Sequence, residues 1–340
     1  MMLSIELENQ KFLDIDLDES VYITGPNQKQ MWKIFRSLYY YFNKAPQLST
    51  NIYGDDKIEI TFDDEAMSVK NNETYFINSR ESIYNQMIYK KNSLLFDYLN
   101  SQSDNIEVNH NLERMNDELL KIELNLQDTL DENSNNLKVS FQEQTYSDLL
   151  KNNLMMNYEL DNSIYPLEFM DTEALLDEFL NFLKFKLDND GHTVWLILYN
   201  LESFVSAEEM YNFVLKAKNM AAESDMKLIV IGNSLENIPI CEHDVENIVI
   251  AADEFHQMLP FENLLETIKL HYPADFYWSP EDTVNAIRRI APLVGSSKKM
   301  FISSKDLVLL KVVNEILGYE TSFNLECSLL NSTETKFLKD

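Results

Sequence analysis

The stretch VYITGPNQKQMWK, residues 21–33, decides how the rest of the chain is interpreted. Its apolar start predicts a strand, and Gly25, Pro26 and Asn27 predict a sharp turn, with a helix from there to about Phe42. Strand, glycine turn and helix form the setting of a phosphate-binding loop, in which backbone N–H groups surround phosphate. The stretch therefore invites comparison with the pattern G-x-x-x-x-G-K-[ST] beginning at Gly25.

The chemical groups of that pattern are missing here. Gln30 stands in place of the second glycine, Met31 in place of the lysine, and Trp32 in place of the hydroxyl that holds Mg²⁺. A later apolar strand ends at Asn200, where an ATPase of this class places a metal-binding aspartate. We interpret the stretch as a degenerate phosphate loop and expect neither a nucleotide cofactor nor ATP hydrolysis. An ordinary turn is the alternative interpretation.

Strands and helices alternate along most of the chain, which predicts an α/β fold with a parallel or mixed sheet. Strands are expected at residues 2–8, 11–17, 20–24, 57–62, 67–70, 74–77, 193–199, 227–231 and 248–251. Helices are expected at 171–187, at 206–222, after Ser279 and at 303–318. With the degenerate loop, this order predicts a degenerate P-loop ATPase-like core.

A change of character divides the chain into parts. Residues 80–153 contain neither glycine nor proline, and an apolar stripe at helical spacing runs through Leu112, Met115, Leu119, Ile122 and Leu126. We therefore predict the first part of the α/β core at 1–80, a mostly helical insertion at 81–165, the second part of the core at 166–272 and a C-terminal extension at 273–340.

Composition limits the class of protein. Apolar residues make up 45% of the 340 residues, enough for a packed core, and the only cysteines are Cys241 and Cys327, too few for a disulfide scaffold. The first residues lack a signal-peptide pattern, and the longest apolar run, Val194–Tyr199, is too short to cross a bilayer. We expect a cytoplasmic protein without membrane contact.

A formal net charge of −29 argues against nucleic-acid binding, but the basic residues are unevenly distributed. No Asp or Glu occurs in two acid-free windows, residues 27–54 and 283–305. These windows are either solvated faces that relieve repulsion or patches that bind phosphate without reading sequence. The candidate DNA-contacting residues in them are Lys29, Lys33, Arg36, Lys44, Arg288, Arg289, Lys298 and Lys299.

Two helical patterns complete the candidate sites. On the helix after Gly25, the basic residues share one sector, and a second, packing sector holds Trp32, Phe35, Leu38, Tyr39 and Phe42. At the end of the long helix of the insertion, carboxylates cluster at Asp128, Asp131 and Glu132. They are candidate calcium ligands, although a D-x-D-x-D loop is lacking and a solvated acidic face is the alternative.

The order of these features resembles the type II-A CRISPR-associated adaptation protein family. The resemblance covers residues 1–270 and rests on the degenerate loop, the helical insertion, and the runs LILYNLES (196–203), SAEE (206–209) and KLIVIGNS (227–234). About 70 residues follow that part, as in the long form of the family. The resemblance implies a homotetrameric ring with a basic channel that binds double-stranded DNA ends and has no ATPase activity. It also implies calcium in the helical region, and a role in spacer acquisition beside the CRISPR integrase complex and the effector nuclease.

The sequence thus predicts a non-catalytic DNA clamp whose binding is confined to the acid-free windows. Residues 281–318 are expected to extend the basic surface or to contact a neighbouring subunit. Two alternatives stay open. One is an ATPase of the chromosome-maintenance type, and the other is an acidic protein-interaction scaffold that does not bind DNA.

Overall fold

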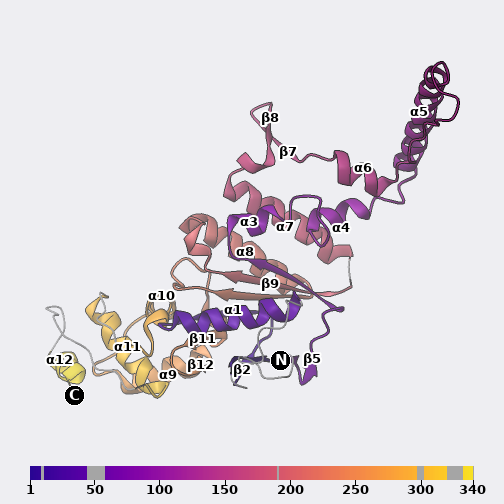
Figure 1. Ribbon diagram of the computed structural model, residues 1–340. Coiled ribbons are helices and arrows are strands. Elements are labelled where there is room, and N and C mark those ends of the chain that lie inside the picture. Colours follow the sequence, from indigo (N-terminus) through magenta and orange to yellow (C-terminus); the bar gives the residue numbers. More distant parts are fainter. Residues whose placement is uncertain (9–10, 44–57, 190, 297–301, 320–331, 340) are drawn as a thin grey trace. The chain divides into compact units, whose positions relative to one another are not determined.

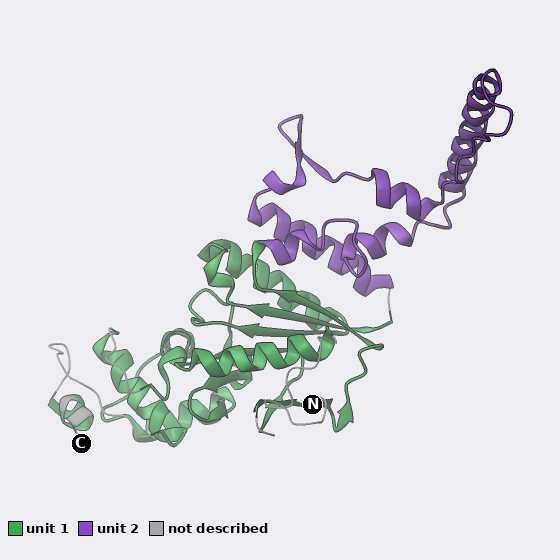
Figure 2. Ribbon diagram, viewed as in Figure 1, with its two compact units in different colours: residues 1–80, 190–340 green, residues 81–189 purple. Residues whose placement is uncertain are grey.

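The computed structural model describes residues 1–8, 11–43, 58–189, 191–296, 302–319 and 332–339 (Figure 1). The chain divides into two compact units, which are described separately below (Figure 2). Unit 1 comprises residues 1–80 and 190–340, and unit 2 comprises residues 81–189.

A six-stranded sheet forms the centre of unit 1, in the order β12-β11-β3-β10-β9-β6. Its strands are β3 (Ser20–Thr24), β6 (Asn72–Ile77), β9 (Thr193–Tyr199), β10 (Met226–Ile231), β11 (Ile248–Ala251) and β12 (Phe255–Gln257). All neighbours pair in parallel except β11 and β12, so the sheet is mixed, as predicted. Ile229 of β10 pairs with Val21 of β3 and with Ile197 of β9. These three central strands are largely buried and apolar, as expected of strands that are covered on both faces of the sheet.

A second, four-stranded sheet in the order β2-β1-β4-β5 consists of β1 (Met2–Glu6), β2 (Phe12–Asp16), β4 (Ile60–Phe62) and β5 (Glu65–Ala66). Its strands alternate, with Leu3 and Ile5 inside, and these side chains share one core with the apolar face of α1 (Gln28–Phe42). The predicted strand at 67–70 is wrong, because β5 ends at Ala66 and a turn follows.

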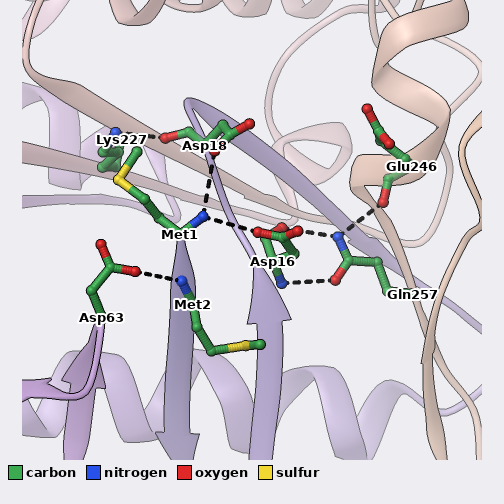
Figure 3. Close-up of polar contacts among 8 residues, drawn as sticks. All are labelled: Met1, Met2, Asp16, Asp18, Asp63, Lys227, Glu246 and Gln257. Atoms are coloured by element: carbon green, nitrogen blue, oxygen red, sulfur yellow. Dashed lines mark hydrogen bonds and ion pairs between the residues drawn. The ribbon is translucent and has the colours of Figure 1, made fainter.

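Polar contacts join the two sheets at the start of the chain (Figure 3). The side chain of Gln257, at the end of β12, bonds the backbone N–H and carbonyl of Asp16 in β2, each at 2.9 Å. Lys227 of β10 donates to the carbonyl of Asp18 at 2.5 Å, and Asp63 accepts from the N–H of Met2 at 2.8 Å. The Gln257 bonds tie β2 of the small sheet to β12 of the large one, the Lys227 bond ties β10 to the segment after β2, and the Asp63 bond lies within the small sheet.

Besides α1, the described helices of unit 1 are α8 (Ala207–Glu223), α9 (Phe261–His271), α10 (Pro280–Ile290), α11 (Ser304–Ile316) and α12 (Ser332–Lys339), with short 3-10 turns η3 (Leu201–Ser203), η4 (Glu242–Asn247) and η5 (Ala291–Leu293). Three of them, α8, α10 and α11, begin at caps that the sequence predicts. Ser206 and Glu209 form a capping box at α8, and Ser279 and Ser303 cap α10 and α11. Helices α9, α10 and α11 gather at one end of unit 1 (Figure 1), so the described part of 273–340 is packed into this unit rather than set apart.

Unit 2 is mostly helical. It contains α4 (Leu94–Asn100), α5 (Ile106–Asp131), α6 (Tyr146–Asn153), η2 (Leu167–Phe169), α7 (Thr172–Asn189) and the hairpin β7 (Asn157–Leu160) and β8 (Ser163–Pro166), and α3 (Arg80–Tyr84) begins at its boundary. Within this unit α5 extends away from α4 and α7, and none of its residues is buried (Figure 1).

The predicted boundary at residue 165 differs from the observed one at 189. Helix α7 belongs to unit 2 because α4 packs on it. The ring of Tyr98 contacts Phe182 and Phe185, with centroids 5.2 and 4.7 Å apart, and Lys186 forms an ion pair with Asp97 at 2.8 Å. A helix that follows an insertion can pack on the insertion as well as on the core, and the sequence pattern is the same in both cases.

Candidate functional site

The loop between β3 and α1 is packed tightly against the end of β11. A Cβ atom on Gly25 would lie 2.4 Å from the carbonyl oxygen of Ala251, so only glycine fits there. Two residues later, the N–H of Asn27 donates to the same carbonyl at 3.1 Å. The turn is therefore closed by the neighbouring strand.

Three amides around the start of α1, those of Asn27, Gln30 and Met31, have partners within the chain. Asn27 caps the helix, since its Oδ1 atom accepts from the N–H of Gln30 at 3.2 Å. The carbonyl of Asn27 also accepts from the N–H groups of Gln30 and Met31, at 3.0 and 3.2 Å. Backbone N–H groups at a helix start attract phosphate only while they lack other acceptors. These three residues are poorly placed to offer such donors.

Aromatic rings lie beside the loop. The ring of Phe35 stacks on Tyr199 with centroids 4.4 Å apart, and Trp32 meets the same tyrosine edge-on at 5.8 Å. On the predicted packing sector, Phe35, Leu38 and Phe42 are buried. Trp32 and Tyr39 contact neighbouring rings but keep exposed fractions of 45% and 40%. Burial of Tyr199 and the nearby carboxylate of Glu202 raise the pKa of its hydroxyl. Together these rings form an aromatic cluster beside α1 that is partly exposed to solvent.

The strand ends of β9 and β10 form a closed polar network. The Nδ2 atom of Asn233 donates to Oδ1 of Asn200 at 2.7 Å, and the N–H of Asn233 donates to Oε1 of Glu202 at 2.6 Å. Asn200 adopts left-handed backbone geometry with φ 55°. The sequence pattern identified Asn200 but not its pairing with Asn233, although the carboxyl ends of neighbouring parallel strands meet at one edge.

A small cavity lies where these elements meet. Its volume is about 110 Å³, and it is lined by Gln28, Met31, Tyr199, Asn200, Ile231, Gly232 and Asn233. Pockets that hold drug-sized ligands measure roughly 300–1,000 Å³. The space between the loop and the strand ends is therefore too small for a nucleoside triphosphate in this conformation.

Two of the predicted DNA-contacting cations converge on one carboxylate. Lys33 Nζ lies 2.8 Å from Glu8 Oε2, and the Arg36 guanidinium lies 2.5 Å from Glu8 Oε1. The exposed side-chain fractions are 18%, 15% and 24% for Lys33, Arg36 and Glu8. Hydrogen bonds from Lys33 and then Arg36 lower the pKa of Glu8. We call this group the Glu8 triad, and nothing in the sequence pattern pointed to Glu8.

The arginines of the second acid-free window are also engaged within the chain. Arg288 donates to the backbone carbonyls of Leu235, at 3.2 Å, and Glu236, and burial lowers the pKa of its guanidinium. Arg289 binds Asp306 through two hydrogen bonds of 3.0 and 2.8 Å. These side chains join α10 to its neighbours, and their contact with phosphate stays a prediction.

The four remaining candidate DNA-contacting residues are lysines, and the structure describes only one of them. Lys29 is exposed on the first turn of α1, and in the described part of the chain no ion-pair partner lies near it. Lys44, Lys298 and Lys299 lie outside the described residues.

The candidate calcium ligands do not form a site on their own. Asp128, Asp131 and Glu132 are exposed at the end of α5, and Asp131 accepts from Gln127 at 2.6 Å and pairs with Lys138 at 3.4 Å. Across the residues that the structure describes, no group of three or more His, Cys, Asp or Glu side chains is placed to hold a metal ion. The prediction of a calcium site from these three residues is therefore not supported.

None of the helices within the described ranges combines the length and apolarity that a membrane span requires.

Comparisons with known proteins place the chain in a family. Residues 8–339 match the family model of the CRISPR-associated protein Csn2 subfamily St. The crystal structure of Stu0660 of Streptococcus thermophilus aligns over 100% of both chains with a TM-score of 0.85 and 19% identity, which shows a shared fold. A structure of cbiO1 from Clostridium perfringens, part of the ABC transporter complex cbiONQ, aligns over 80% of this chain and 95% of that chain. Its TM-score of 0.40 and 12% identity are too low to carry an argument.

The chain matches no curated protein. The family match covers almost the whole length, including the loop at Gly25, the insertion and the described part of the C-terminal extension. It confirms the resemblance to the type II-A CRISPR-associated adaptation protein family. This chain belongs to the Csn2 family of CRISPR-associated proteins, subfamily St.

Proposed function

We propose that this chain is a non-catalytic clamp that binds double-stranded DNA, including its ends, and assists spacer acquisition. The match to the Csn2 family over residues 8–339 carries the proposal, because that family has a CRISPR-associated role in adaptation. In this proposal the chain acts beside the CRISPR integrase complex and the effector nuclease, and it contributes binding rather than chemistry.

The geometry of the degenerate loop supports the non-catalytic part. Met31 provides no cation for the outer phosphates, and Asn200 has no carboxylate for Mg²⁺. The N–H of Asn27 is already bonded to Ala251, and the adjoining cavity measures about 110 Å³. Binding and hydrolysis of ATP would require this region to open and to gain groups that the sequence lacks.

The charge distribution supports a localised DNA contact. With a net charge of −29, most of the surface repels a phosphate backbone, so binding needs a region where cations dominate. Helix α1 provides one, since Lys29 is exposed and lies one turn from Lys33 and two turns from Arg36. Contacts of this kind are salt-sensitive and carry little base preference.

Exposed apolar side chains support self-association into a ring. Helix α5 has no buried residue, and its large exposed side chains are Ile106, Leu120, Ile122, Leu124 and Leu126. The two-stranded hairpin β7–β8 also exposes Ile164 and Tyr165, although an isolated hairpin is marginally stable in water. In the proposed homotetramer a second copy of the chain covers these surfaces.

A mobility-shift assay that compares linear with closed-circular duplex tests the proposal. Preference for the linear form, with affinity that falls steeply as salt rises, is expected of a ring loaded from DNA ends. Binding of neither form contradicts the proposal and favours the acidic protein-interaction scaffold. ATP turnover that is lost on Asn200→Ala would instead favour the ATPase alternative.

A further inference from the structure

The Glu8 triad holds two cations of α1 on an acceptor that resembles a phosphate. Each oxygen of the Glu8 carboxylate binds one cation, Lys33 at 2.8 Å and the Arg36 guanidinium at 2.5 Å. A phosphate group offers the same arrangement of two anionic oxygens to a lysine and an arginine. A DNA backbone and Glu8 therefore cannot use these two side chains in the same way at the same time.

The triad is placed so that exchange is possible. Its side chains retain exposed fractions of 15–24%, so the triad is partly open to solvent. Glu8 follows β1, whereas both cations lie on α1, so the contact joins different elements. Breaking it requires movement of one glutamate side chain and leaves the strand and the helix in place.

Other charges around the triad strengthen its effect on DNA. A cleft of about 430 Å³ beside it has Glu8, Lys11, Asp14, Lys33, Asp253 and Glu254 among its lining residues. Together with the Arg36 guanidinium at the Glu8 carboxylate, the cleft holds four carboxylates and three cations, so phosphate approaching Lys33 meets net repulsion while Glu8 is charged. Removal of the Glu8 charge leaves three carboxylates and three cations, which removes the net negative charge of the group.

We propose that Glu8 is an internal competitor that masks a phosphate-binding pair, Lys33 and Arg36, and that duplex DNA must displace it. The inference rests on the proposed DNA-binding function and adds regulation to the same surface. Glu8 thereby lowers the affinity of the free protein for phosphate backbones in general. A loaded clamp in which the carboxylate has been displaced makes both cationic contacts.

The test measures binding of a fluorescently labelled linear duplex to full-length wild type, Glu8→Gln and Glu65→Gln at low salt. Glu8→Gln is expected to bind about threefold to fivefold tighter than wild type, because one partly exposed ion pair no longer competes. Glu65→Gln removes the same charge from an exposed site on β5 and is expected to change affinity by less than about twofold.

A double-mutant cycle excludes a general charge effect. The gain from Glu8→Gln is expected to vanish in the Lys33→Gln/Arg36→Gln background, since the unmasked cations are absent there. Glu8→Asp keeps the charge but shortens the side chain. It is expected to give a smaller gain, and it replaces Glu8→Gln in the test if that variant does not fold.

The outcomes separate the two proposals. If wild type binds duplex and the Lys33→Gln/Arg36→Gln variant binds less, but neither Glu8 variant binds more tightly, Glu8 is only a structural brace and the inference is overturned. A gain that persists without both cations also overturns it. If no variant binds duplex, the proposed function fails, and the inference fails with it.

Discussion

The N–H of Asn27 donates a hydrogen bond to the carbonyl oxygen of Ala251, across 3.1 Å. This bond ties the turn after β3 to the end of the neighbouring strand β11, at the place where a phosphate loop would turn its amides outward. The close approach depends on Gly25, which has no Cβ between the two backbones. The loop that lacks the side chains of a phosphate loop thus makes a backbone contact within the protein.

Replacement of Gly25 by alanine is expected to lower the free energy of unfolding by about 2–4 kcal/mol. The added Cβ would lie 2.4 Å from the Ala251 oxygen and 2.7 Å from its carbonyl carbon, and backbone atoms cannot move aside as a flexible side chain can. Urea denaturation measures the change. Gly191→Ala is the matched control, since nothing lies within 4 Å of its added Cβ, and a similar loss in both variants would contradict the argument.

The ion pair of Arg289 with Asp306 is expected to stabilise unit 1 rather than to bind DNA. Asp306 retains an exposed side-chain fraction of 7%, so Arg289→Gln leaves a buried carboxylate without its bidentate partner, at a cost of about 2 kcal/mol. Thermal unfolding measures this, with Lys121→Gln as the control, because that lysine pairs with Glu118 at the surface. Loss of duplex affinity in Arg289→Gln without loss of stability would restore the phosphate-facing interpretation.

The Glu8 triad makes stability depend on pH in the acid range. Hydrogen bonds from Lys33 and Arg36 lower the pKa of folded Glu8 below its ordinary value of 4.5. A lowered folded-state pKa means that the charged glutamate stabilises the protein above about pH 4.5 and that this contribution disappears as pH falls through the folded pKa. Wild type is therefore expected to exceed Glu8→Gln by about 1 kcal/mol at neutral pH, a modest value because the triad is partly exposed.

Urea unfolding of both proteins at neutral pH and at about pH 3 measures this difference. The neighbouring carboxylates Asp14, Asp253 and Glu254 are present in both proteins, so the comparison isolates the change at position 8. A difference that stays constant over this range would show that the ion pairs do not stabilise the fold.

Much of the fold was predictable because its central strands are continuous apolar stretches of the sequence. The strands β9, β10 and β11 are buried on both faces and follow directly from continuous apolar stretches, and the Ser206–Glu209 capping box marks the start of α8. The unit boundary was not predictable to the same degree. An amphipathic helix such as α7 shows which face is buried and not which neighbour buries it.

The candidate site was harder to predict because its bonds join distant residues. The basic stripe on α1 is visible in the sequence, but Glu8 lies 28 residues before Arg36 and follows β1 of the small sheet. In the same way, charge alone could not show that Arg289 pairs with Asp306. Local pattern reports the type of a side chain and its helix face, whereas its partner depends on tertiary packing.

Self-association through α5 gives the last prediction. Leu120 and Leu124 lie one turn apart on this helix, with exposed fractions of 53% and 57%, and α5 has no buried residue. Leu120→Glu/Leu124→Glu is therefore expected to leave the fold of the single chain intact while charging the apolar surface that a second copy covers. Light scattering after size exclusion is expected to show a smaller species than wild type, with unchanged far-ultraviolet circular dichroism. Asn111→Glu/Asn125→Glu adds the same charge at exposed polar positions of α5 and is expected to keep the wild-type mass. Equal masses for the leucine variant and wild type would show that the exposed leucines of α5 do not hold the assembly together.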